Sequence, residues 1–562
     1  MAALLLGAVI LPAQQVSDPD LFAKSLSATQ QALAQYGRHD VPEELRRVND
    51  IGYRIARESG FQEFPFTFHL IDMPEPNAFA LPGGQIFLTR GMLDLDLDDD
   101  MLAGLLGHEI AHVVERHGVR MQKRATLLNA LSQALLVGVM IAADDSSRRP
   151  ADPYYDPRDP RARGSVKGDM IQGTYAAGIV VTELLLRGYS REFEDEADEE
   201  GQRWAAGAGF DPDGTRRLMA RMEARIPQTK TYGYWRTHPF FDQRVLAAEV
   251  RRELLTVQSP RPADDYRSRT QKELLALTDL PKLAPELVEL LRWQALNAWP
   301  QGELADQLRL DRLHRQREEL LAQTELRQDL TALVEAYREE IATVRELTPK
   351  SPFITTARQE IEELERLRDE RYPSFVETWK QRVFETGFLE TFLSNYPESE
   401  YADAVALALG DAYSRSRRQT EAVEQYLTAW RAAPDSEAGR RARAGLRNLV
   451  PYLDRLSALQ RLAEQDDLEL ARLAEERLQK MASTYKELEN GAEYLKRFPD
   501  GPYQEPVARR LDALANELLG ELLLYQAVGD TVKALERIRV ILTHAPLSPA
   551  ADKLRQRAVL DS

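Results

Sequence analysis

Two short segments of this chain are strand-like, and the first of them alternates aromatic and other residues with a period of two. The first runs from Phe64 to Leu70, and the second runs from Gln85 to Thr89 after the turn at Gly83-Gly84. This period is typical of β-strands, in which successive side chains point to opposite faces. No other segment shows it as clearly, so we expect a mostly helical protein with one small sheet: an α+β domain followed by α-helices.

The helical period of 3.6 residues begins directly after the second strand. The carboxylates of residues 98–100 can cap the apolar-periodic segment Met101 to Val114. Further helices are predicted from Tyr175 to Leu186 and from Arg191 to about Ala208. The acidic run at 94–98 could instead form a calcium loop, but it lacks the glycine such a loop requires, so capping is favoured.

The region between these helices contains an apolar run and a polar loop. Residues 127–143 are just long enough to approach a membrane span, but the polar residues within the run favour a helix packed on protein or touching a membrane surface. We therefore expect at most a peripheral membrane contact. Residues 144–168 are rich in Pro, Arg, Asp and Gly and predict a loop, which is either a lid or an insertion without a role.

Beyond residue 257 the pattern is almost entirely helical, with charged amphipathic stretches at 313–346 and 354–371. A proline-rich break at 348–352 marks a candidate boundary. We therefore predict four parts, namely a signal-peptide remnant at 1–13, a catalytic domain at 14–256, a helical connecting region at 257–350 and a tetratricopeptide-like repeat domain at 351–562.

The repeat prediction rests on internal similarity. Residues 392–401 recur as 494–503, and Val405 and Leu409 match Val507 and Leu511 at the same offset. The helix-turn-helix-proline order at 404–434 is typical of tetratricopeptide units. Stacked units form concave surfaces that bind proteins. The alternative is a helical tail that only packs on the catalytic domain.

Composition argues against some kinds of partner and site. The formal charge of −17, from 73 basic and 90 acidic residues, argues against a nucleic-acid partner. The chain has no cysteine, so disulfides, thiolate zinc sites and cysteine nucleophiles are excluded, and a metal would be held by histidines and carboxylates. The apolar stretch Met1 to Ala13 predicts a signal-peptide core and a periplasmic location, although it lacks a basic region before it. The alternative is a buried N-terminal segment of a cytoplasmic protein.

The segment His108-Glu109-Ile110-Ala111-His112 carries the candidate chemistry. Residues four apart share one face of a helix, so both imidazoles can reach one Zn²⁺ ion while Glu109 lies beside it as a general base. This spacing is typical of metal-assisted peptide hydrolysis, and the alternative is a helix that carries two histidines by coincidence.

A catalytic zinc site of this class needs a third protein ligand. Glu194 and Asp198 lie four residues apart on one predicted helix face, so one could bind the metal while the other accepts a proton from a ligand imidazole. From spacing alone Glu192, Asp195 and Glu196 compete, because acidic helix faces are usually solvated.

Three motifs together resemble the metallopeptidase family that includes HtpX and the CAAX prenyl protease. They are His108 to His112, the stretch Ser190-Arg191-x-x-Glu194-x-x-Ala197-Asp198, and Asn77 to Gly84 followed by Phe87 to Gly91. The resemblance covers roughly residues 40 to 250. It implies one Zn²⁺ per chain with Glu194 as third ligand and Asp198 as hydrogen-bond partner of a ligand.

The same resemblance implies roles for other residues. It places His238, within Thr237-His238-Pro239, and Arg244 near the site. His238 could donate a hydrogen bond to the tetrahedral oxyanion, occupy the open zinc position in a closed form, or be purely structural. The strand with Asn77, Ala78 and Phe79 is expected to pair with the substrate backbone.

The known membrane members of this family differ from this chain, which lacks clear spans. A helical repeat tail is instead similar to the branch that acts in the periplasm of Gram-negative bacteria on β-barrel assembly. We therefore expect a zinc endopeptidase of the cell envelope that cleaves misfolded or stalled proteins, with a protein partner, such as the outer-membrane assembly machinery, on the repeats. The alternative is an assembly chaperone or interaction protein with latent protease activity.

Overall fold

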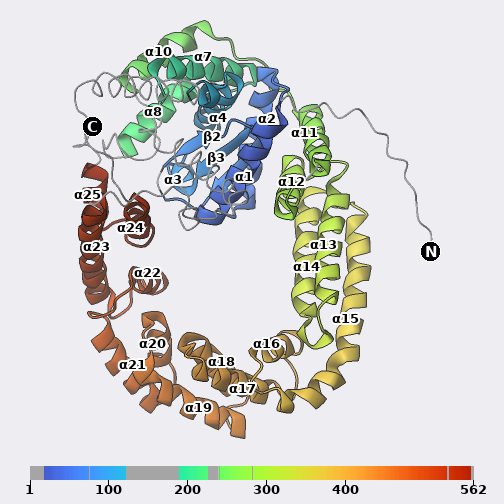
Figure 1. The fold of residues 1–562 in the computed structure, drawn as a ribbon, viewed down its shortest axis with the longest axis vertical. Helices are drawn as coiled ribbons and strands as arrows, with labels where there is room; N and C mark the ends of the chain where they lie inside the picture. The colour runs from blue at the N-terminus through green and yellow to red at the C-terminus, as the bar shows by residue number, and fades with distance from the viewer. Residues whose placement is uncertain are drawn as a thin grey trace, which may run out of the picture. The chain divides into compact units, whose positions relative to one another are not determined.

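The computed structural model describes residues 18–74, 76–121, 189–225, 238, 241–280, 283–527 and 531–557. They form two compact units, residues 1–299 with 555–562, and residues 300–554 (Figure 1). Both units are mainly helical and the first contains one small sheet, so the predicted fold class is confirmed. The four predicted parts stay predictions. The expected signal peptide, the apolar run 127–143, the loop 144–168 and the helix at 175–186 lie outside the described residues.

The sheet of the first unit has three strands in the order β1-β3-β2. Their bounds are β1 Thr67–Ile71, β2 Ala78–Ala80 and β3 Gln85–Thr89. β1 runs parallel to β3, and β2 runs antiparallel to it with Phe79 opposite Phe87. These two rings stack with centroids 4.7 Å apart. Every strand residue is buried, including the polar Thr67 and His69 that alternate with aromatic and aliphatic residues in β1.

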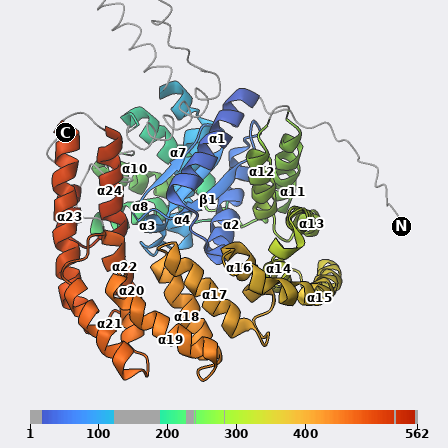
Figure 2. The same cartoon turned by 60° about the horizontal axis from the view of Figure 1, so that its bottom comes forward.

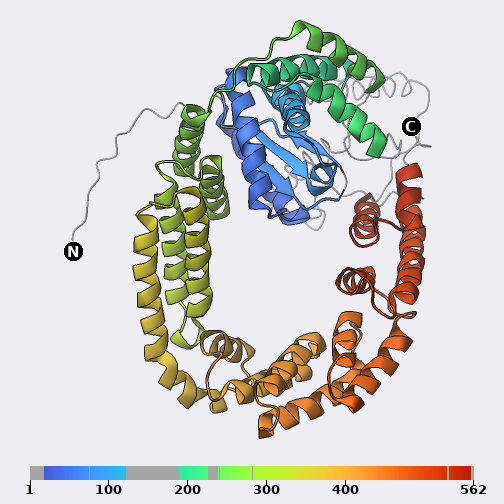
Figure 3. The same ribbon diagram turned by 180° about the vertical axis from the view of Figure 1, so that it is seen from behind.

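Helices surround this sheet (Figure 3). They are α1 Pro19–Tyr36, α2 Pro42–Ser59, α3 Arg90–Leu93, α4 Asp99–Val114, α7 Arg191–Gly207, α8 Asp213–Arg225 and α10 Phe241–Leu254. The predicted cap of α4 is confirmed, since the Asp98 carboxylate accepts a hydrogen bond from the Met101 amide at 2.9 Å. α4 packs against α2, β2, α7 and α8 and is buried along almost its whole length. It is therefore the central element of the unit.

Two helices of the predicted connecting region also belong to the first unit. They are α11 Asp264–Ala276, which leads into the 3-10 turn η2 Leu277–Asp279, and α12 Pro285–Ala298. Arg267 of α11 bonds Asp50 of α2 at 2.7 Å, and Asn49 of α2 bonds the Asn297 carbonyl at 3.1 Å. These contacts extend the core of the first unit to residue 299. Among the described helices, none is both long and apolar enough to cross a membrane.

Within its described residues the second unit contains consecutive helices and short 3-10 turns, and the last helix continues three residues past the boundary at residue 554 (Figure 2). Their bounds are α13 Ala305–Leu321, η3 Glu325–Arg327, α14 Leu330–Leu347, α15 Phe353–Thr378, η4 Trp379–Gln381, α16 Thr386–Asn395, α17 Ala402–Arg415, α18 Gln419–Ala432, α19 Glu437–Leu449, η5 Val450–Tyr452, α20 Leu456–Ala463, α21 Leu468–Met481, α22 Leu488–Arg497, α23 Gln504–Ala527, α24 Thr531–His544 and α25 Pro549–Arg557. The amphipathic stretch 313–346 is thus two helices, because Asp329 caps a new start at α14.

The internal similarity found in the sequence has a structural counterpart. α16 and α22 begin and end at equivalent residues of the two copies, and α17 and α23 begin at equivalent residues. Both turns are built alike: the Tyr396 amide bonds the Phe392 carbonyl, and the Phe498 amide bonds the Tyr494 carbonyl. α23 is longer than α17, so the equivalence ends there.

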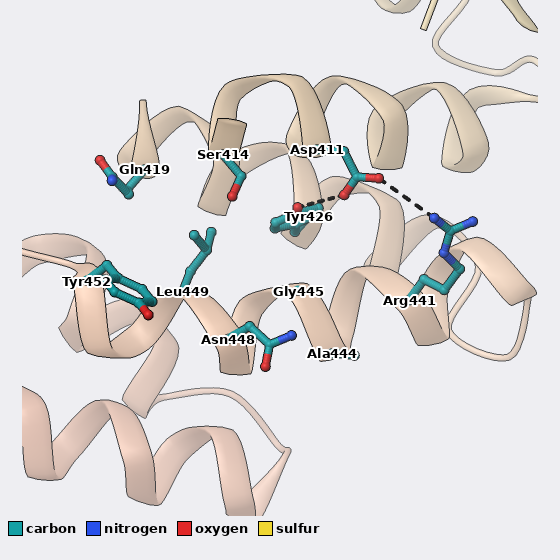
Figure 4. A pocket seen from close by; sticks show the side chains of 10 residues that line it. All are labelled: Asp411, Ser414, Gln419, Tyr426, Arg441, Ala444, Gly445, Asn448, Leu449 and Tyr452. Carbon is teal, nitrogen blue, oxygen red and sulfur yellow. Dashed lines mark hydrogen bonds and ion pairs between the residues drawn. The ribbon is translucent and has the colours of Figure 1, made fainter. Parts of the chain in front are cut away.

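A groove of about 560 Å³ lies between α17, α18 and α19 (Figure 4). It is lined by Asp411, Ser414, Gln419, Tyr426, Arg441, Ala444, Gly445, Asn448, Leu449 and Tyr452. The Tyr426 hydroxyl donates to Asp411 at 2.7 Å, and Arg441 lies 3.7 Å from the same carboxylate. Tyr452 is 71% exposed, so an aromatic face is open to solvent beside these polar groups.

Candidate metal centre

Four buried side chains converge in the first unit. They are His108 and His112 of α4, Glu194 of α7, and His238, whose ligand-capable atoms all lie within 4.8 Å of one another. The Nε2 atoms of His108 and His112 are 3.0 Å apart, and the Glu194 carboxylate lies 3.7 Å and 3.5 Å from them. The sequence motifs at 108–112 and 194 therefore meet in space.

The crossing of α4 and α7 brings these residues together. Gly107, next to His108, contacts Gly201 of α7 backbone to backbone, and a Cβ on either glycine would overlap the other helix. This close approach lets the face of α7 with Glu194 and Asp198 reach the imidazoles of α4, because side chains four residues apart share a face. Spacing alone also allowed Glu192 and Asp195 as the third ligand. On α7, however, Glu192 is exposed and Asp195 is half-buried.

Asp198 and Arg244 lie beside His108. Asp198 Oδ1 lies 2.8 Å from His108 Nδ1, and Arg244 donates to both Asp198 oxygens at 2.7 and 2.8 Å. Arg244 also pairs with Glu194. Burial alone would raise the pKa of the Asp198 carboxyl, but Arg244 and the hydrogen bond from His108 hold it well below its usual range. Asp198 is thus a charged acceptor for the His108 ring.

His112 also has a hydrogen-bond partner at its Nδ1 atom, and this partner was not predicted from the sequence. His112 Nδ1 lies 2.8 Å from His117 Nδ1, and His117 Nε2 lies 3.0 Å from Glu196 Oε2. Tyr189 stacks on the His112 ring with centroids 3.9 Å apart. The sequence did offer one signal for this contact: three histidines, His108, His112 and His117, lie within ten residues.

Glu109 lies beside the cluster in the same buried space. Its Oε1 is 3.5 Å from His238 Nε2, and neither carboxylate oxygen accepts a hydrogen bond from the described residues. Burial raises the pKa of Glu109 to about 7. A carboxylate held in this way can exchange a proton near neutral pH.

The charge states of the cluster suit a divalent metal ion. Burial, with the Arg244 charge, lowers the pKa of His108 to about 4, and burial also holds the pKa of His112 well below its usual range. Burial alone would raise the pKa of Glu194, but the nearby His238 and Arg244 hold this pKa well below its usual value. Neutral imidazoles and an ionised carboxylate are the ligand forms that Zn²⁺ requires, so these residues fit the ion that the motif implies.

His238 is the fourth member of the group. Its Nδ1 lies 3.0 Å from both Glu194 Oε1 and His108 Nε2, and its pKa is raised because Glu194 and Glu109 outweigh the effect of burial. Its neighbours Thr237 and Pro239 lie outside the described residues. The histidine at position 238 therefore lies directly at the cluster.

The strand expected to pair with substrate lies next to α4. Asn77 precedes β2, and its amide and carbonyl bond the Thr89 hydroxyl and amide of β3 at 2.9 and 3.0 Å. Ala78 and Phe79 are within β2, which is the last strand of the sheet and has one neighbour among the described residues. β2 thus offers an edge close to the helix that carries His108 and His112.

The comparisons with known proteins agree with this geometry. Residues 42–252 match the model of Peptidase family M48. The chain is 29% identical over 226 residues to the mitochondrial metalloendopeptidase OMA1 of Schizosaccharomyces pombe, covering 40% of this chain and 58% of that protein. It is 31% identical to the Danio rerio metalloendopeptidase OMA1, covering 37% and 39%. It is 24% identical to the β-barrel assembly-enhancing protease of Escherichia coli K12, covering 39% and 41%. The chain thus spans 58% or less of the length of these relatives.

Proposed function

Residues 42–252 form a domain of peptidase family M48, and from this premise we propose that the protein is a zinc-dependent endopeptidase. The observation that carries the proposal is the buried cluster of His108, His112, Glu194 and His238 with Glu109 beside it. In this proposal the substrate is a protein chain, and misfolded or stalled proteins are its physiological class.

His108, His112 and Glu194 would hold one zinc ion per chain. When bound, the ion supplies a Lewis acid for the scissile carbonyl and for the attacking water. Asp198 and Arg244 keep the His108 ring oriented toward the cluster through its Nδ1 atom. Two ligands from one helix turn and one from a crossing helix leave room for a substrate atom.

Glu109 is the proposed general base. Its carboxylate removes a proton from the water that attacks the peptide carbonyl, and the same oxygen later delivers that proton to the leaving nitrogen, so no proton is gained or lost. The pKa of about 7 that burial produces allows both transfers near neutral pH. Both oxygens of Glu109 are buried and accept no hydrogen bond from the described residues, so both remain able to accept one from a water bound there.

The edge of β2 supports a mode of substrate binding. An extended peptide can add to an exposed sheet edge through main-chain hydrogen bonds, which gives affinity with little dependence on sequence. Asn77 to Phe79 are buried, but β2 pairs with one strand only among the described residues, so its other edge is the one a peptide could join, and β2 contacts α4. This mode suits an enzyme that cleaves unfolded proteins of varied sequence.

The test of the proposed activity is Glu109→Gln in the full-length chain. We expect hydrolysis of fluorescently labelled casein to fall by about 10²–10⁴-fold, with one zinc ion per chain retained. Glu199→Gln, on the exposed face of α7, is the matched control and should leave both unchanged. Wild-type activity in Glu109→Gln would refute the endopeptidase proposal and favour an assembly chaperone or interaction protein.

We further propose that the second unit binds an extended segment of a protein partner or substrate. The groove beside Asn448 and Tyr452 combines amide, charged and aromatic groups, which can bond a peptide main chain and cover an apolar side chain. The proposal predicts that Tyr452→Ala weakens binding of unfolded casein to the full-length Glu109→Gln protein, while cleavage of a short peptide by the otherwise wild-type chain with Tyr452→Ala is unchanged. Equal binding would refute it.

A periplasmic location remains part of the proposal. Some relatives are named as β-barrel assembly-enhancing proteases, which favours an assembly machinery for β-barrel proteins as partner in this proposal, whereas other relatives are named as mitochondrial. Fractionation of the source cells tests it: recovery with the cytoplasmic fraction would refute the location without affecting the enzymatic proposal.

A further inference from the structure

His117 is the buried group that the mechanism above leaves without a role. Its ring is fully buried and stacks on Phe193 with centroids 4.5 Å apart and planes 16° apart. Arg120 covers the same Phe193 ring at 4.5 Å and bonds Glu196 at 2.9 Å. The ring position of His117 is thus fixed by packing on one side and by charged groups on the other.

We propose that His117, anchored by Glu196, is a positioning residue that sets the tautomer and the ring orientation of His112 at the metal centre. This inference rests on the proposed zinc site. It adds a second support beside Asp198, because the Nδ1 atom of His108 bonds a carboxylate directly, whereas the Nδ1 atom of His112 is connected to one through the His117 ring.

The proton positions follow from the proposed ligand role of His112 together with the contacts of the two rings. His112 Nε2 faces the cluster, 3.0 Å from His108 Nε2, so a ligand role requires its lone pair there and its proton on Nδ1. That proton can only be donated to His117 Nδ1 at 2.8 Å, which must then be unprotonated. The remaining proton of a neutral His117 lies on Nε2 and is donated to Glu196 at 3.0 Å.

Each bond in this series has one consistent direction. Glu196 Oε2 also accepts a hydrogen bond from Arg120 at 2.9 Å, so it is the acceptor at the far end of the series. An acceptor there requires the proton of His117 to lie on Nε2, and this leaves Nδ1 free to accept from His112. Removal of a residue that hydrogen-bonds a metal ligand commonly weakens metal affinity by roughly 10–100-fold.

The experiment compares zinc affinity in the full-length chain, measured by competition with a chromogenic chelator. His117→Phe keeps a ring on Phe193 but removes the acceptor, so we expect roughly 10–100-fold weaker zinc binding. His117→Asn places an oxygen near the former Nδ1 position and should restore part of that loss. Glu196→Gln should weaken binding by several-fold, and Glu199→Gln on the same helix should not change it.

Two further measurements separate positioning from general stability. The Co²⁺ form should show a shifted visible absorption spectrum in His117→Phe, because the ligand field at His112 changes. A purely structural role would lower the unfolding temperature of the metal-free protein and leave zinc affinity and spectrum unchanged, which would overturn the inference. If His117→Phe does not fold, unchanged affinity in both His117→Asn and Glu196→Gln overturns it. A wild-type chain that binds no zinc would refute the proposed function instead.

Discussion

Gly107 of α4 and Gly201 of α7 are in direct backbone contact. A Cβ atom on Gly201 would lie 2.5 Å from the Gly107 carbonyl carbon, and one on Gly107 would lie 2.6 Å from the Gly201 carbonyl oxygen. Real Cβ atoms do not approach backbone so closely, so neither position accepts a side chain unless the helices separate. The contact therefore sets the distance between the two helices that carry the candidate metal ligands.

We expect Gly201→Ala to destabilise the protein and to weaken zinc binding. Alanine favours helix by roughly 1 kcal/mol over glycine, but overpacking costs typically about 1–3 kcal/mol and moves α7 away from α4. The measurements are urea unfolding and zinc affinity. Gly520→Ala is the control, because this exposed glycine of α23 has open space around it and should become more stable. Equal stabilisation by both substitutions would contradict the close-contact explanation.

The local part of the site could be predicted from sequence. The cap at Asp98 and the spacing of His108 and His112 depend on residues within one helix, and both are present in α4 as expected. The third ligand could not be chosen by spacing, since Glu194 and Glu196 are equally possible on one helix. Only the crossing at the two glycines turns Glu194 toward His108 and His112 and turns Glu196 toward His117.

In the helical region, too, local features could be predicted from the sequence, whereas features that depend on contacts between distant segments could not. The copies at 392–401 and 494–503 were visible as sequence similarity, and their helices share equivalent bounds because the turn after each helix depends on local hydrogen bonds. The division of the chain at residue 299 was not visible, because it depends on contacts such as Asn49 with Asn297 that join distant segments.

Glu194→Ala should abolish stable zinc binding. We expect more than about 100-fold weaker affinity, since loss of an outer partner alone costs roughly 10–100-fold. The measurement is zinc content by atomic absorption after dialysis. Asp195→Asn is the matched control, because Asp195 is the adjacent carboxylate of α7 that competes on spacing and lies outside the cluster. Unchanged zinc content in Glu194→Ala would remove Glu194 from the ligand set, and lost zinc in Asp195→Asn alone would assign the third ligand to Asp195 instead.

His238→Ala should keep zinc and accelerate hydrolysis of a short peptide by several-fold. A catalytic zinc site keeps one position open, and His238 Nδ1 lies 3.0 Å from Glu194 Oε1, where a fourth ligand would close the site. The substitution spares the bond from Arg244 to the carbonyl of residue 238 at 3.2 Å. The measurement is the steady-state rate at saturating peptide. Slower hydrolysis with unchanged zinc would instead assign His238 to stabilisation of the oxyanion.

Asp467→Asn should destabilise the second unit in a pH-dependent way. The Asp467 side chain is almost completely buried, pairs with Arg443 and Arg447, and caps α21 by accepting from the Leu470 amide at 2.9 Å. Burial would raise its pKa, but the two arginines and the cap lower it to about 2. Because the folded pKa lies below the unfolded value of about 4, the charge stabilises the fold fully above about pH 4, and this stabilisation is lost as the pH falls toward 2.

Asparagine is chosen because it also caps helices well, so the substitution removes the charge and keeps the cap. We expect a difference in unfolding free energy of about 1–2 kcal/mol between wild type and Asp467→Asn from pH 5 to 8, shrinking below pH 4. Urea unfolding followed by helical circular dichroism measures it. Asp466→Asn, at the exposed neighbour, should show no difference at any pH. If the difference in unfolding free energy between wild type and Asp467→Asn stays constant down to pH 3, the shape of this side chain, and not its charge, determines its contribution to stability.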